Sequence, residues 1–545
     1  MTVVNDSMLS HTPNDHEDAE PIDICRDVAV PCFSSPVNHN VLLTLALWGS
    51  HGIADSLWSD TVIVSYLSIL ASQLSKADGS HKSRPRNDVV GYIEACKGLV
   101  GVVLALPIGY FADHLHHGRQ RVIAYGGVLT IIAAISSIWL LLYIGDQNDD
   151  DTTHSPRTSP DLNHIVVLFA GVMSMWGVSN LIVDGPVSAL YADSVAAGQR
   201  SRYYVYLNNT WLLGTTVGPA LSIFWFRSGS DSWTLSELKN IILLGVLLQG
   251  MTSIFMFLFD DRKSLPEEEG GKGDDDTAES SAPEEECENL VLSLAPGDAS
   301  ARADLESLRR RRRKIPYILF MAEMVSALGS GMTIKFFPLY FKNTVGMSPS
   351  QVQTIYVVAP FVLVVTSSLA EKTSRSLGRV QTIILFSSMG VISLYSMVLF
   401  EDYLVPRWYL LVPIYLLRNA MMNSGGALWE SILMDSVPKN ERARWISLNS
   451  IATFGWCGSA ALGGVLADKF GYTYSFLITA IIQTLATLML LLLLPLVPME
   501  DSSSNQDNNN AMNRPQEEDI RRDEDDTTNI LPVEDVNDLT LPLLS

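Results

Sequence analysis

Long apolar runs separated by short polar stretches dominate the chain. Twelve of these runs have about the 20 residues that an α-helix needs to cross a ~30 Å hydrocarbon core. They begin near Asn40, Val89, Arg121, His164, Tyr203, Leu238, Pro316, Gln351, Val380, Trp408, Trp445 and Ser475. The pattern predicts an all-α polytopic membrane protein with 12 transmembrane helices.

A polar connector occurs twice, at residues 193–202 and 435–444. The two copies share Asp, Ser, Val and both Arg residues at a constant offset of 242 positions. Each copy follows one apolar run and leads into another, which opens on Tyr203 or Trp445. A repeat of this length predicts two pseudo-symmetric six-helix bundles, an arrangement typical of secondary transporters.

Polar segments flank and separate the two predicted bundles. We expect a disordered cytosolic tail at 1–39, an N-terminal bundle at 40–260, a cytosolic linker at 261–315, a C-terminal bundle at 316–497 and a second disordered cytosolic tail at 498–545. The linker is rich in Glu, Asp, Gly and Ser and closes with the basic run 309–314. This composition is typical of a flexible connection with a basic end beside the membrane.

The composition agrees with a membrane protein. Of the 545 residues, 47% are hydrophobic, and the acidic residues behind the net charge of −22 are concentrated in tails and loops. That charge therefore gives no indication of nucleic-acid binding. The five cysteines show no pairing pattern for an extracellular disulfide. We expect no cleavable signal peptide in the polar first 38 residues.

Basic residues near the helix ends predict the orientation in the membrane. They are concentrated in the even-numbered connections and at the end of the linker, although the first outer connection also holds four of them. The balance places both termini and the linker in the cytosol. It does not distinguish the plasma membrane from an organelle membrane.

The loop between the second and third predicted helices carries a recognisable motif. It reads Gly109-Tyr-Phe-Ala-Asp113-His-Leu-His-His-Gly118-Arg119-Gln-Arg121. The order of Gly, Asp, Gly and basic residues resembles the signature loop of the major facilitator superfamily, with two extra residues between Asp113 and Gly118. The resemblance implies a gating motif, in which charges at a cytoplasmic helix end lock the two halves in one state and release them in another.

A second motif lies in the fifth predicted helix. Gly214, Gly218 and Pro219 resemble the superfamily's GxxxGP pattern, which is associated with antiporters. Glycines at i and i+4 also let any two helix backbones approach closely, and proline bends a helix. Antiport and simple packing are both open interpretations of this motif.

Charged residues inside the apolar spans are candidate functional positions, because each costs about 2.5 to 3.5 kcal/mol at a helix centre. The resemblance implies that helices one, four, seven and ten line a central cavity. The candidates for solute binding and proton coupling are Asp55, Asp60, Asp184, Glu323, Lys335, Arg418 and Asn423. If Asp55 faced Arg418, protonation of the carboxylate would unpair the arginine and change the charge of the cavity.

Other polar residues of the first two helices have simpler interpretations. His51, Asp55 and Trp58 share one face of the first predicted helix. Glu94 and Lys97 are three positions apart, a spacing at which the two charges stabilise a helix by neutralising each other.

Acidic residues outnumber basic ones within the spans, which favours a cationic or zwitterionic solute over a bare anion. The chain has no ATP-binding loop and no Cys and His spacing typical of a metal site. No nucleophile, base and orienting group can be assembled from it. We therefore expect no cofactor, no metal and no enzymatic activity.

The leading hypothesis is a monomeric secondary active transporter that moves a small organic solute by alternating access and couples this movement to protons. Its partners would be the solute, the proton and the lipid bilayer, with no nucleic acid. Two alternatives stay open: a facilitative uniporter of the same fold, and a transporter-like sensor or scaffold.

Overall fold

The computed structural model describes residues 38–77, 86–115, 118–149, 162–195, 200–264, 313–437 and 442–497. Among these residues there are helices and turns but no strand. The predicted tails and most of the predicted linker lie outside the described residues. By their contacts, residues 1–274 and 347–357 form one unit, and residues 275–346 and 358–545 form a second.

The first unit is built from long helices with short irregular breaks. Its α-helices are α1 (His39–Trp58), α2 (Val62–Ala77), α3 (Asn87–His114), α4 (Gly118–Asp149), α5 (Leu162–Ile182), α6 (Ser188–Asp193), α7 (Arg200–Ser228) and α8 (Leu235–Thr252). A π-helical turn, Val183–Val187, joins α5 to α6, and 3₁₀ turns follow α8 at Ser253–Phe257 and Asp261–Lys263.

The second unit has the same construction. Its α-helices are α11 (Ile315–Gly331), α12 (Phe337–Tyr340), α13 (Pro349–Leu377), α14 (Arg379–Leu399), α15 (Glu401–Leu404), α16 (Trp408–Asn423), α17 (Gly426–Ser436), α18 (Arg442–Phe470) and α19 (Tyr472–Leu490). The first residues of α13 belong to the first unit. Shorter turns lie at Ile334–Phe336, Phe341–Val345, Val405–Arg407 and Leu491–Leu493.

The helices agree closely with the apolar pattern. Each of the twelve predicted segments begins within three positions of a helix start. Eight helical stretches among the described residues are long and apolar enough to cross a membrane: 39–75, 118–144, 162–193, 235–257, 315–345, 349–377, 379–399 and 472–493. The other four predicted spans coincide with α3, α7, α16 and α18.

Local sequence explains several of the helix boundaries. The Asn38 side chain accepts a hydrogen bond from the backbone N–H of Asn40, and the Thr234 side chain does the same for Glu237, so α1 and α8 are both capped. The residues before α14 and α19 are Gly378 and Gly471, with φ of 94° and 91°. Only glycine adopts such angles without strain, so both tight connections depend on it.

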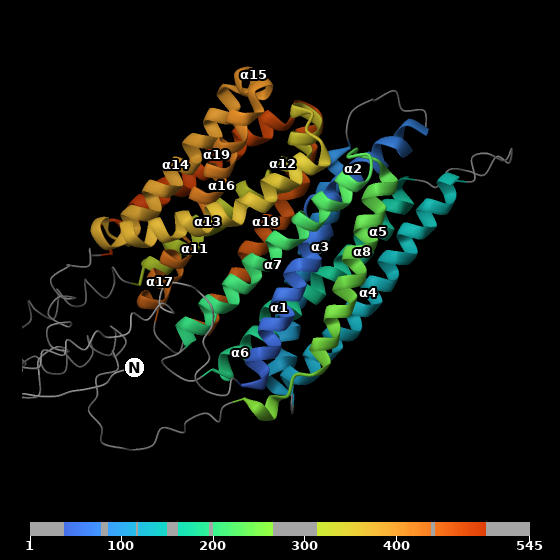
Figure 1. Cartoon of the computed structure of the whole chain (residues 1–545). Coiled ribbons are helices and arrows are strands. Elements are labelled where there is room, and N and C mark those ends of the chain that lie inside the picture. Colours follow the sequence, from blue (N-terminus) through green and yellow to red (C-terminus); the bar gives the residue numbers. More distant parts are fainter. Residues whose placement is uncertain are drawn as a thin grey trace, which may run out of the picture. The chain divides into compact units, whose positions relative to one another are not determined.

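Glycines allow close helix contact in the first unit. Helices α1 and α7 run side by side (Figure 1), and α8 also packs against α1. A Cβ at Gly218 of α7 would overlap Oγ of Ser56 and lie 2.6 Å from the backbone nitrogen of Leu57. The helix backbones could not come this close if a larger residue replaced Gly218.

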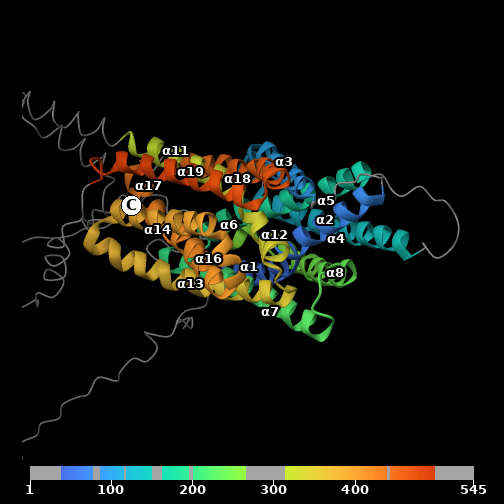
Figure 2. The same ribbon diagram turned by 90° about the horizontal axis from the view of Figure 1, so that it is seen from above.

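In the second unit, a glycine also allows close helix contact, here around the first helix of that unit. Helix α11 packs against α18 and α19, and the three lie together in Figure 2. A Cβ at Gly331 of α11 would overlap the carbonyl oxygen of Trp456 on α18. Helix α11 therefore has α17, α18 and α19 as neighbours.

Candidate functional site

A pocket with a cavity volume of about 410 Å³ lies inside the second unit. This volume is within the usual range of small-molecule sites. Its walls come from α11, α14, α16, α17, α18 and α19. The lining residues with polar or aromatic side chains are Glu323, Ser326, Ser330, Ser387, Arg418, Asn423, Trp429, Trp456, Gln483 and Thr487.

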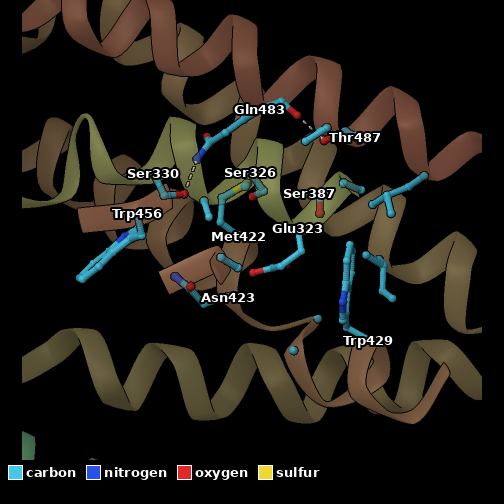
Figure 3. A pocket seen from close by; sticks show the side chains of 18 of the residues that line it. Glu323, Ser326, Ser330, Ser387, Met422, Asn423, Trp429, Trp456, Gln483 and Thr487 are labelled. Carbon is cyan, nitrogen blue, oxygen red and sulfur yellow. Dashed lines mark hydrogen bonds between the residues drawn. The ribbon is translucent and has the colours of Figure 1, made fainter. Parts of the chain in front are cut away.

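The pocket contains both a negative and a positive side chain. Glu323 of α11 is half-buried and lies between Trp456 and Trp429, which stand at opposite ends of the pocket (Figure 3). Arg418 of α16 is only 2% exposed. Its guanidinium carbon lies 5.1 Å from the ring centroid of Phe337, and its Nε has no hydrogen-bond partner. A buried guanidinium of this kind can bind an anionic group.

Hydroxyl and amide groups form another part of the wall. Nε2 of Gln483 donates to Oγ of Ser330 over 3.0 Å, which joins α19 to α11 (Figure 3). Oε1 of the same amide is buried without a partner. Nδ2 of Asn423 donates to the carbonyl oxygen of Asn419 over 2.7 Å. The pocket therefore offers neutral acceptors and aromatic faces beside its two charges.

Lys335 lies next to this pocket rather than in its lining. It belongs to the 3₁₀ turn after α11 and is buried. Its Nζ lies 5.8 Å from the ring centroid of Trp456, a cation–π distance. The structure thus brings Glu323, Arg418 and Asn423 into one pocket and places Lys335 behind one of its aromatic walls.

The first unit holds a second group of ionisable residues. Asp55 is half-buried on α1, one turn from the buried His51. The charges of Asp55 and Lys97 act on both His51 and Asp184. A Cβ at Gly177 of α5 would lie 3.0 Å from Cγ of Lys97, so the lysine side chain packs against α5. Lys97 therefore contacts a neighbouring helix as well as lying three positions from Glu94 on α3.

Asp184 and Asp60 both lie where an α-helix is interrupted. Asp184 is exposed in the π-helical turn that also contains Pro186. Asp60 is exposed in the turn between α1 and α2.

The signature loop joins α3 to α4. A Cβ added to Gly109 of α3 would have no neighbour within 4 Å, whereas a Cβ at Gly118 would lie 2.5 Å from the carbonyl oxygen of Ala112. Arg119 forms an ion pair with Asp193 at the end of α6, and Arg121 is exposed. The side chain of Asp113 lies outside the described residues.

The second unit contains a matching ion pair. Arg379, the first residue of α14, pairs with Asp435 of α17 over 2.5 Å and donates to Oγ of Ser431 over 2.7 Å. Asp193 and Asp435 occupy the same position in the two copies of the repeated connector. In each unit, the first residue of this polar connector therefore pairs with an arginine near the start of another helix.

The sequence matches the major facilitator superfamily over residues 53–322 and 319–523, well over half of its length. The chain belongs to this superfamily. It is accordingly an integral multi-pass membrane protein. A comparison with curated proteins found no match.

Solved structures share the superfamily fold at low sequence identity. A bacterial homologue of the iron transporter ferroportin in an inward-facing state has a TM-score of 0.59 and 13% identity, covering 83% of this chain and 97% of that one. A D-xylose-proton symporter has a TM-score of 0.58 and 17% identity, covering 84% and 97%. The partially occluded inward-open xylose transporter XylE from E. coli has a TM-score of 0.56 and 16% identity, covering 84% of this chain and 97% of that one.

The helix-five motif of the superfamily falls on the contact between α1 and α7. A Cβ at Gly214 would lie 2.7 Å from the carbonyl oxygen of Gly49, and Pro219 is buried inside α7. Both glycines of the motif therefore serve close helix packing. Its association with antiport stays a prediction.

Several polar residues in these sites escaped the sequence analysis. Ser330 and Gln483 line the pocket, and Asn180 and Gln249 lie beside His51. For the two glutamines, the sequence did offer a signal. A glutamine inside an uninterrupted apolar run must find a hydrogen-bond partner when it is buried. Among the described residues, no group of three or more His, Cys, Asp or Glu side chains could hold a metal ion.

Proposed function

We propose that the protein is a secondary active transporter of a small zwitterionic or cationic organic solute, coupled to protons and working by alternating access. The pocket of the second unit carries the proposal, because it combines Glu323, Arg418 and aromatic walls in one cavity. A zwitterion would present its anionic group to Arg418 and its cationic group to Glu323. The superfamily and the fold of the solved transporters support transport rather than catalysis.

The proton-coupled part of the proposal rests on the ionisable residues of the first unit. Asp55 lies close enough for its charge to act on both His51 and Asp184. Such groups inside a membrane protein are typical of proton pathways. The xylose symporter among the structural neighbours is coupled to protons. We further propose cytosolic termini, on the basis of the basic residues near the helix ends.

Transport can be tested with the purified chain in liposomes that contain a pH-sensitive dye. Pooled zwitterionic metabolites and pooled organic cations are supplied outside as probes. We expect one pool to drive a change in internal pH together with accumulation of the solute. Uptake without a pH change would indicate a facilitative uniporter. Thermal stabilisation by a pool without any flux would indicate a sensor.

The pocket is tested by Glu323→Gln. We expect the solute concentration for half-maximal flux to rise about tenfold or more, because a hydrogen bond to a charged group contributes about 1.5 to 3 kcal/mol. Glu371→Gln is the matched control, since it removes an exposed carboxylate on α13 that pairs with Arg375 one turn away. Equal effects of the two substitutions would contradict a solute site at Glu323.

A further inference from the structure

Three buried polar side chains connect α1 to α8. The indole Nε1 of Trp58 donates to Oε1 of Gln249 over 2.6 Å. Nε2 of Gln249 lies 3.3 Å from Nε2 of His51. The exposed fractions of His51, Trp58 and Gln249 are 5%, 2% and 0%. Because the three side chains have almost no access to water, they must satisfy one another.

The chemistry of these groups determines which atom carries a proton. An indole N–H only donates, so it must face the oxygen of the Gln249 amide. The amide nitrogen, which also only donates, is then directed at Nε2 of His51. That ring nitrogen must accept the hydrogen bond, and it does so only when it carries no proton. The contacts from Trp58 to Gln249 and from Gln249 to His51 form one link between α1 and α8. This link requires a neutral His51 that is protonated on Nδ1.

Packing prevents the link from rearranging. A Cβ at Gly245, one turn before Gln249 on α8, would lie 2.7 Å from Cδ1 of Trp58, so the indole lies directly against the helix. The Trp58 ring also packs on Trp176, with 5.4 Å between ring centroids. The His51 ring stacks on Trp211 of α7 at 6.1 Å. Gln249 cannot turn its oxygen toward His51 without leaving the Trp58 N–H unpaired.

Charged and polar groups surround His51 on several helices. Asp55 lies one turn away on α1, and Lys97 acts on His51 from α3 with the opposite sign. The charges of Asp55 and Lys97 also act on Asp184. Asn180 of α5 lies within hydrogen-bonding reach of His51, and its buried Oδ1 has no partner. The oxygen of Asn180 is therefore an acceptor available to the N–H groups of the His51 ring.

We propose that His51 is a proton-binding residue and that a proton on its Nε2 breaks the hydrogen-bonded link between α1 and α8. This inference deepens the proposed proton-coupled transport and rests on it for its role in transport. When Nε2 is protonated, two N–H donors face each other. The bond to Gln249 is then lost. The half-buried Asp55 lies one turn from this buried ring on α1.

The tautomer and the titration can be read by NMR of the full-length protein in nanodiscs, with ¹⁵N-labelled histidine and tryptophan. His51→Gln identifies the His51 signals by their loss, and His164→Gln, at the exposed start of α5, is the matched control. At about pH 8, well above the ordinary pKa of histidine, we expect an unprotonated Nε2. On acidification this nitrogen becomes protonated, and the Trp58 indole signal shifts at the same pH. An Nε2–H tautomer, or a ring that stays neutral to about pH 5, overturns the proposal.

A second substitution tests the direction of the effect. Gln249→Glu keeps the shape of the side chain but places a carboxylate between Trp58 and His51. A nearby opposite charge favours the protonated ring, so we expect the midpoint of the His51 titration to rise by about 1 to 3 pH units. An unchanged midpoint would show that Gln249 does not face Nε2 and would contradict the link.

Transport separates the two proposals. The NMR titration needs no solute, so it decides whether His51 binds a proton even if no pool is transported. If the wild type moves solute and protons together, we expect His51→Gln to retain solute movement and to lose the accompanying pH change. If His51→Gln still moves protons with the solute, the role of His51 in coupling is wrong while the proposed transport stands.

Discussion

At the scale of single residues, polar side chains buried inside apolar helices form the most informative contacts. Gln249 and Gln483 are both 0% exposed. Each lies in the last long helix of its unit and binds a residue of that unit's first helix, Trp58 in one case and Ser330 in the other. A glutamine in such a place stabilises the protein only when its partner is present. These two residues therefore specify how helices far apart in sequence pack.

Arg418 gives a prediction at this scale. Within the part of the chain that the structure describes, no carboxylate pairs with this buried guanidinium. Burying a charge costs solvation energy, and even buried ion pairs can often be replaced by hydrophobic residues of similar volume with no loss, or with a gain of about 1 to 4 kcal/mol. We expect Arg418→Met to abolish solute-driven flux while the solute-free protein melts at the same temperature or higher. The control Arg375→Met, on the exposed face of α13, should change neither the flux nor the melting temperature. A marked loss of melting temperature in Arg418→Met alone would mean that Arg418 has a structural role.

At the scale of elements, glycine and proline decide where helices meet and where they break. The seventh predicted span ends as α11 at Gly331 and continues through a 3₁₀ turn to α12, which has Pro338 in its first turn. The glycine removes a side chain at the contact with α18, and the proline fits a helix start. This break positions Lys335 beside Trp456.

The contact between α1 and α7 can be tested by Gly218→Ala. The added methyl group would overlap Ser56 and the backbone of Leu57, and overpacking of this kind usually costs about 1 to 3 kcal/mol of unfolding free energy. The control is Gly171→Ala in α5, where nothing lies within 4 Å and alanine favours the helix. Melting temperatures in nanodiscs should fall for Gly218→Ala and hold or rise for Gly171→Ala. Equal melting temperatures for the two variants would mean that α1 and α7 are not in close contact.

At the scale of the whole molecule, distant chain segments are tied together by polar groups at the helix ends. The repeated connector yields the pair of Arg119 with Asp193 and the pair of Arg379 with Asp435. Within the first unit, the loop before α8 reaches the start of α13. There Asp231 accepts hydrogen bonds from the backbone N–H of Ser350 over 3.0 Å and from its Oγ over 2.8 Å.

Asp231 gives a pH-dependent prediction. Burial raises the pKa of its carboxyl, but the hydrogen bonds from Ser350 and Ser348 and the charge of Arg227 outweigh this effect and lower the pKa below 3.8. Because the folded pKa is the lower one, the stabilisation is complete above the unfolded pKa and is lost as pH falls through the folded pKa.

Asp231→Asn tests this contact without disturbing the backbone. Asp231 has φ of 46°, a conformation that asparagine also tolerates. We expect the wild type to melt at a higher temperature than the variant near neutral pH, and the difference to fade as pH falls below 3.8. A constant difference at every pH would show that the charge does not cause it.

The apolar pattern predicted the helices well because crossing a bilayer imposes a minimum length of about 20 residues on each span. The positions of Glu323, Arg418 and Asn423 could also be selected from the sequence, since polar residues are conspicuous in such spans, and the structure brings these three into one pocket. Their roles remain predictions. The domain boundaries and the proposed pairing of Asp55 with Arg418 also remain predictions, and these two residues belong to different units.

The sequence by itself therefore determined the class of protein, the starts of its helices, its internal repeat and its resemblance to the superfamily. These properties depend on local composition and spacing, which any reader of the chain can measure. Only the tertiary structure decided which polar groups meet. Trp58 and Gln249 are 191 positions apart, and Ser330 and Gln483 are 153 positions apart. Helix packing brings such residues together through contacts of whole helix faces, and no local pattern records the partner.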